Sequence, residues 1–83
     1  MKKSPSDKEL ATFYAAKRNG DSSEQARKML NLSKSQIHYW KEKGGKAIKK
    51  KREGYYLDKD EKDCLHLLKL IKAADRRRRG WTN

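Results

Sequence analysis

Three serines in the N-terminal half of the chain each stand three residues before a glutamate or glutamine, and this spacing constrains the fold more than any other feature. The pairs are Ser6 with Glu9, Ser22 with Gln25, and Ser33 with Gln36. In such a capping box the serine side chain accepts a hydrogen bond from a helical N–H, and the Glu or Gln side chain returns to the serine N–H. The pattern predicts three closely spaced helix starts.

Glycines and one acidic pair complete the predicted element order. The first helix should cover 7–19 and end at Gly20, the second 23–30, and the third 34–43, ending at Gly44 and Gly45. Asp58 and Glu61 form an acidic start for a fourth helix from about residue 59. For 46–57 two alternatives stay open, a flexible basic linker or a small β-hairpin wing.

Apolar residues at helical spacing predict the core. On the first helix they are Leu10, Ala11, Phe13 and Tyr14, and on the fourth they are Cys64, Leu65, Leu67, Leu68, Leu70, Ile71 and Ala74. Ala26, Leu30, Leu32, Ile37 and Trp40 fall where two helices of a helix-turn-helix pack at a steep angle. Arg27 occupies a position where a small residue usually permits close helix contact, and Asn31 suits the turn because asparagine tolerates left-handed backbone.

We therefore predict an all-α fold, a trihelical helix-turn-helix with a C-terminal fourth helix. The expected division is a module at 1–45, a basic linker or wing at 46–57, and a helix with a basic tail at 58–83, packed as one small domain. With 83 residues, such a domain has no room for a large enclosed substrate pocket.

The charge of the chain predicts an anionic partner. Lys and Arg number 23 against 11 Asp and Glu, a formal charge of +12, and the excess gathers in the segments 44–54 and 76–79. Nucleic acid is the usual partner of so basic a surface, and double-stranded DNA is the one we expect. No apolar run approaches a membrane span and no signal-peptide pattern opens the chain, so we expect no membrane partner and a soluble intracellular protein of the cytoplasm, nucleoid or nucleus.

Enzymatic motifs are absent from the sequence. There is a single cysteine, Cys64, there are two histidines, His38 and His66, and there is no CxxC, HExxH or glycine-rich phosphate loop. Cys64 is expected in the core, and the acidic cluster around Asp58 and Glu61 is expected to complement the dipole of the fourth helix. We predict no catalytic residue, metal site or cofactor.

The outward face of the third helix supplies the predicted DNA contacts. With Ile37 and Trp40 pointing inward, and about 100° of rotation per residue, Ser35, His38 and Tyr39 point outward, flanked by Lys34, Gln36 and Lys41. Lys, Ser, Gln and His side chains can meet base edges in a major groove, while Tyr39 and Lys41 can reach phosphates. The basic segment should bind the phosphate backbone through Lys46, Lys49, Lys50, Lys51 and Arg52.

Two families share these patterns. Residues 10–43, LATFYAAKRNGDSSEQARKMLNLSKSQIHYWKEK, resemble the homeodomain-like helix-turn-helix modules of transposases and pipsqueak-type proteins, in which the third helix reads DNA. Residues 22–82 are similar to the winged helix of the MerR and phage-excisionase families. There IHYWKEKG matches the end of the recognition helix, KKKREGYYL the wing, and DEKDCLHLLKLIK with RGWT the next helix and turn.

Both resemblances imply sequence-specific binding of duplex DNA, by a small transcriptional regulator or a recombination accessory factor of a phage or mobile element. The alternative is a phage DNA-packaging factor, of the small-terminase kind, or an architectural factor. An RNA-binding basic protein is disfavoured, because no aromatic residues interleave with the basic segment. If the apolar face of the fourth helix were only half covered, it would form a homodimer.

Overall fold

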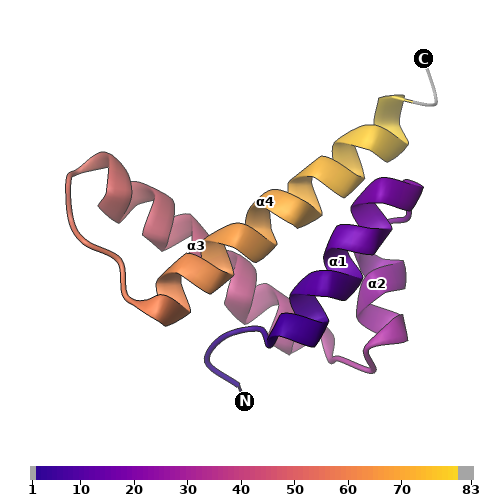
Figure 1. Cartoon of the computed structure of the whole chain (residues 1–83), viewed down its shortest axis with the longest axis horizontal. Helices are drawn as coiled ribbons and strands as arrows, with labels where there is room; N and C mark the ends of the chain where they lie inside the picture. The colour runs from indigo at the N-terminus through magenta and orange to yellow at the C-terminus, as the bar shows by residue number, and fades with distance from the viewer. Residues whose placement is uncertain (1, 81–83) are drawn as a thin grey trace.

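The computed structural model describes the backbone of residues 2–80 and the side chains of residues 2–74. Four helices follow one another: α1 (Asp7–Asn19), α2 (Ser23–Met29), α3 (Lys34–Arg52) and α4 (Lys59–Gly80). In Figure 1, α4 runs obliquely across α3 and beside α1, and α1 lies against α2. No strand occurs between residues 2 and 80, so the predicted all-α fold is confirmed and the hairpin wing at 46–57 is wrong.

The helix starts follow the capping pattern with one exception. Ser6 and Ser22 each take part in a complete capping box. Ser33 accepts from the Gln36 N–H at 3.1 Å, but the Gln36 side chain does not return to it and instead donates to the carbonyl of Lys2 at 2.8 Å. The local spacing therefore predicted all three helix starts correctly. It did not predict the partner of the Gln36 side chain, which is the Lys2 carbonyl, distant in sequence.

The predicted end of the third helix is wrong. Instead of stopping at Gly44 and Gly45, α3 continues to Arg52, and the segment expected to be a linker or wing is helical as far as that residue. Gly44 lies where α3 crosses α4 so closely that a Cβ atom on it would stand 2.6 Å from the carbonyl oxygen of Cys64. This glycine serves close helix packing, and the glycine that follows the end of α3 is Gly54, with φ 91°, one residue after the C-cap Glu53.

The core forms mainly where the apolar pattern predicted. Ala26, Ile37 and Trp40 are buried, Leu30 and Leu32 pack against them, and the whole predicted set on α4 from Cys64 to Ala74 is buried. On α1, Phe13 is buried but Tyr14 and Ala11 are exposed, so their predicted burial is wrong. The single chain thus covers the broad apolar face of α4 against α1 and α3.

An N-terminal arm, residues 2–5, completes the core and was not predicted. The Lys2 carbonyl accepts hydrogen bonds from Trp40 Nε1 at 3.2 Å and from Gln36 Nε2 at 2.8 Å. The Lys2 ammonium pairs with the buried Glu9 carboxylate at 3.3 Å. Burial by itself raises the pKa of Glu9, but hydrogen bonds with Ser6 and the charge of Lys2 outweigh it and hold that pKa below its ordinary value.

Candidate nucleic-acid interface

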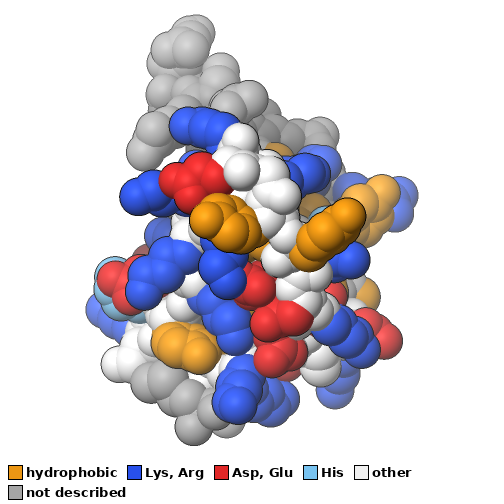
Figure 2. Space-filling model, turned by 90° about the vertical axis from the view of Figure 1, so that its left-hand side faces the viewer, with side chains coloured by type: hydrophobic (Ala, Val, Ile, Leu, Met, Phe, Trp, Pro, Cys, Tyr) orange, Lys and Arg blue, Asp and Glu red, His pale blue; other side chains and the backbone are white. Residues whose placement is uncertain are grey.

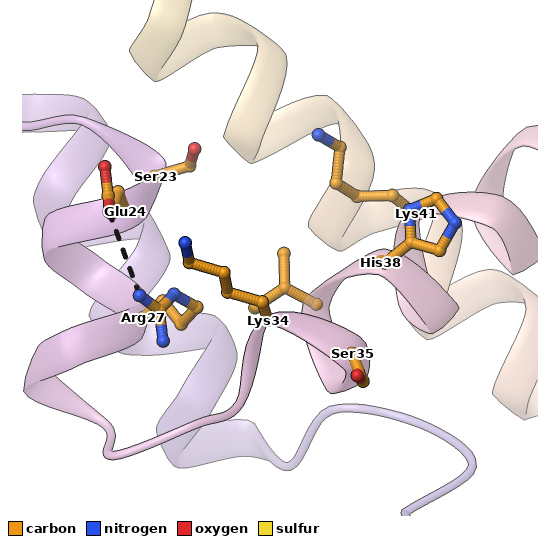
Figure 3. A pocket seen from close by; sticks show the side chains of 8 residues that line it. Ser23, Glu24, Arg27, Lys34, Ser35, His38 and Lys41 are labelled. Atoms are coloured by element: carbon orange, nitrogen blue, oxygen red, sulfur yellow. Dashed lines mark ion pairs between the residues drawn. The ribbon is translucent and has the colours of Figure 1, made fainter.

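An open groove of about 570 Å³ lies between α2 and the N-terminal half of α3. From α3 it is lined by four predicted DNA contacts, Lys34, Ser35, His38 and Lys41, together with Ile37. Ser23, Glu24 and Arg27 of α2 form the other wall, and Figure 3 shows Lys34 extending from α3 toward that wall. The structure therefore brings together the predicted residues nearest the start of α3.

Arg27 holds the turn between α2 and α3. Its guanidinium donates to the carbonyl of Leu32 at 2.7 Å and lies 3.9 Å from the Glu24 carboxylate (Figure 3). Asn31, in the same turn, adopts the left-handed backbone conformation, with φ 58°, which asparagine was predicted to tolerate at this position. Arg27 stands where a small residue is usual. It fits because its guanidinium points away from the contact between the helices and binds the Leu32 carbonyl in the turn.

The extension of α3 creates one long exposed face. Residues 34, 38, 41, 45, 49 and 52 follow one another at intervals of three or four and therefore share a side of the helix. They are Lys34, His38, Lys41, Gly45, Lys49 and Arg52, all exposed. Glu42 interrupts the positive charge beside this face, and its carboxylate lies 3.2 Å from His38 Nε2. The face is thus basic along its length, with polar groups near its start.

Gln36 does not belong to this face. Its side chain is buried beneath the N-terminal arm, so its predicted position on the flank of the outward set is wrong. The remaining outward side chains, Ser35, His38 and Tyr39, are exposed as predicted.

Tyr39, Lys46 and Lys50 lie on another side of α3, next to acidic residues. All three line a hollow that also contains Glu42, Asp58 and Glu61. Lys50 Nζ is 2.7 Å from the Glu61 carboxylate, and this hydrogen bond and the charge of Glu61 raise the pKa of Lys50. Acidic neighbours repel phosphates, so this side is less suited to a polyanion than the face containing Lys34 and Lys49.

Lys51 lies on a third side of α3, different from the face with Lys34 and Lys49 and from the side with Tyr39, Lys46 and Lys50. Together with Arg52 it lines a hollow against Leu65 and Lys69 of α4. Three successive lysines of the basic segment, residues 49–51, are therefore distributed over three sides of α3 instead of forming one phosphate-binding block.

Ser23 and Glu24 were absent from the predicted site. The signal for them was the helix-turn-helix pattern itself, in which the helix before the recognition helix crosses the nucleic-acid backbone. Their position at the start of α2 places them across the groove from Lys34.

Other site chemistry is limited within the described residues. No group of His, Cys, Asp and Glu side chains in that part of the chain could hold a metal ion. Cys64 is buried in the core, and its burial raises its pKa to about 11. None of the described helices has the length and apolar character needed to cross a membrane.

Helices α2 and α3 are joined by the turn at residues 30–33, and α3 carries a polar and basic face, so together they define a helix-turn-helix DNA-binding module. The family model for MerR HTH family regulatory proteins matches residues 22–78, more than half of the chain. The chain belongs to this family. Of the two resemblances, the match supports the MerR type and does not support the homeodomain-like type as the first choice. Comparison with curated proteins and with solved structures gives no match.

Family membership makes the protein a DNA-binding transcription regulator. The wing expected from this resemblance does not form in the described residues. The stretch KKKR ends α3, and residues 53–58 connect it to α4 as a loop.

Proposed function

We propose that the chain is a sequence-specific regulator that inserts the N-terminal half of α3 into the major groove of duplex DNA. Lys34, Ser35 and His38 are the residues nearest the bases, and Lys41, Lys49 and Arg52 contact phosphates along the same face. The observation that carries this proposal is the continuous exposed face of α3, which offers hydrogen-bonding groups at its start and cations further along.

The groove beside α2 supports the same orientation. Arg27 is engaged by Leu32 and Glu24, so it fixes the spacing of the two helices instead of extending toward DNA. A fixed spacing keeps Ser35 and His38 in one register relative to the base pairs. Such preorganisation favours discrimination between sites.

Selection of bound sequences from random duplexes tests the proposal. Once a preferred site is known, Ser35→Ala and His38→Ala should each weaken binding to it by about 1–3 kcal/mol and should change binding to random DNA little. Tyr14→Ala is the control, because this exposed tyrosine lies on α1. Equal losses on preferred and random duplexes would remove the base-reading role of the two residues.

Stoichiometry on the selected site distinguishes the biological roles. We propose a regulator or recombination accessory factor of a phage or mobile element, acting as a two-fold dimer with recognition helices about one DNA turn apart. The apolar face of α4 up to Ala74 is covered within one chain, so a dimer contact would not use that part of α4. Two chains bound to two half-sites are expected. Progressive coating of the duplex would indicate a packaging or architectural factor instead.

A further inference from the structure

The loop between α3 and α4 places two exposed tyrosines at one end of the molecule. Tyr55 is 65% exposed and Tyr56 is 100% exposed. The loop lies at the left of Figure 1, at the far end of α3 from α1 and α2. Figure 2 looks onto this end and shows hydrophobic side chains standing among lysines and arginines, with acidic side chains nearby.

The backbone that carries these tyrosines is fixed to the end of α3. Gly54 has φ 91°, and its N–H donates to the carbonyl of Lys51 at 3.1 Å. The Tyr55 N–H donates to the carbonyl of Lys50 at 3.0 Å. These two hydrogen bonds give the end of α3 a defined conformation, so the backbone of Tyr55 is held in a fixed position next to it.

Two adjoining hollows beside the tyrosines are lined by cations, and none of the described acidic residues lines either of them. Their volumes are about 350 and 380 Å³, and they share Lys51, Leu65 and Lys69. Tyr55, Tyr56 and Lys62 line the first, and Arg52 lines the second. Among the described side chains, none of these cations makes an ion pair, in contrast to Lys50, which is neutralised by Glu61.

We propose that this surface, which we call the Tyr55–Tyr56 surface, binds single-stranded nucleic acid. It is defined by Tyr55, Tyr56, Lys51, Arg52, Lys62 and Lys69. Bases stack on the tyrosine rings, and the phosphates that link them lie against the cations. The surface shares no residue with the groove between α2 and α3, and Arg52 is its only member that also lies on the proposed duplex-binding face of α3, so single-strand binding uses a different set of residues from the reading of bases.

The positive charge of the surface and the exposure of the two tyrosine rings together favour single-stranded nucleic acid as the ligand. Single-strand binding combines a positively charged groove with aromatic side chains that accept successive bases. A duplex hides its base faces in the stack and gives exposed tyrosine rings nothing to stack on. The sequence alone argued against a single-stranded partner because aromatics do not alternate with lysines along the basic segment. In the fold, cations lie next to the tyrosines, because Lys62 and Lys69 of α4 line the same hollow as Tyr55 and Tyr56 of the loop.

The test measures binding of a short fluorescein-labelled oligothymidylate to the full chain by anisotropy. The double variant Tyr55→Leu/Tyr56→Leu should bind the single strand about 5- to 150-fold more weakly for each tyrosine on which a base stacks. Tyr55→Phe/Tyr56→Phe should retain binding, because phenylalanine also stacks. Tyr14→Leu, at a tyrosine 50% exposed on α1, should change nothing. Lys62→Ala and Lys69→Ala should each lower the slope of log affinity against log salt by about 0.7.

Duplex binding by the leucine pair should equal that of the parent chain. Unchanged affinity of the leucine pair for oligothymidylate would overturn the proposal. Equal losses on single strands and duplex would assign the surface to the duplex interface instead. Each of these two results contradicts base stacking at Tyr55 and Tyr56.

Discussion

Gly44 and Gly45 are neighbours in the middle of α3, and exchanging each for alanine should have opposite effects on stability. A Cβ atom on Gly44 would lie 2.6 Å from the carbonyl oxygen of Cys64 and 3.1 Å from Leu68 Cβ. A Cβ atom on Gly45 would have no neighbour within 4 Å. The first position requires a glycine for the crossing of α3 and α4, and the second does not.

The magnitudes follow from these surroundings. Either substitution lowers the backbone entropy of the unfolded chain and favours the helix by about 0.5–1 kcal/mol. Gly45→Ala should show this gain alone. Gly44→Ala must also push α4 away, because its new contact is with backbone, and overpacking of this kind costs about 1–3 kcal/mol. The helix term cancels between the variants, so Gly44→Ala should be less stable than Gly45→Ala by about 1–3 kcal/mol.

Urea unfolding of both variants, followed by far-ultraviolet circular dichroism, measures this difference. In a domain of this size each kcal/mol also moves Tm by about 4–8 °C, so thermal unfolding gives a second reading. The parent chain should lie between the two variants or close to Gly44→Ala. If Gly44→Ala were as stable as Gly45→Ala, the close crossing of α3 over α4 would be refuted.

Three further predictions concern charge and packing. Lys49→Ala should lower the salt slope of duplex binding by about 0.9, whereas Lys50→Ala should leave the slope unchanged because Lys50 is paired with Glu61. Because the pKa of Glu9 is lowered from 4.5 by folding, its contribution to stability is present above that value and is lost as the pH falls through the folded pKa. Unfolding of Glu9→Gln across acidic pH should therefore show a flatter dependence than the parent. Trp40→Ala, which empties a fully buried site, should lose about 3–5 kcal/mol of unfolding free energy, and a fully stable variant would contradict the packing of α2 on α3.

Features set by neighbours in sequence were the most predictable from sequence. The serine caps depend on contacts three residues apart, and all three helices begin where those caps place them. The apolar set on α4 and the burial of Ile37 and Trp40 also followed from helical spacing. Gln36 was wrongly predicted to flank the outward face of α3. Its side chain donates to the Lys2 carbonyl, a partner 34 residues away in sequence that no local pattern indicates.

The glycine pair shows why the site was harder to predict. Glycine ends helices, and it also permits close helix contact, so Gly44 fits either interpretation. The continued spacing of Ile37, Trp40, Gly44 and Ala47 was the signal for the second, because all four share the buried side of α3. Once α3 is extended, the lysine run is wound around a helix, and this alone separates Lys49 from its two neighbours.

The central claim, that the start of α3 lies in the DNA major groove, is tested most directly by cleavage from a tethered iron chelate. Ser35→Cys and Tyr14→Cys would each carry the chelate through the new thiol, while Cys64 stays unmodified because it is buried and its pKa is raised to about 11. On the selected duplex, the chelate at residue 35 should cut a few adjacent base pairs within the bound site, and the chelate at residue 14 should cut there weakly or not at all. Cleavage from residue 35 that is no stronger than from residue 14, or that spreads evenly along the duplex, would contradict the claim.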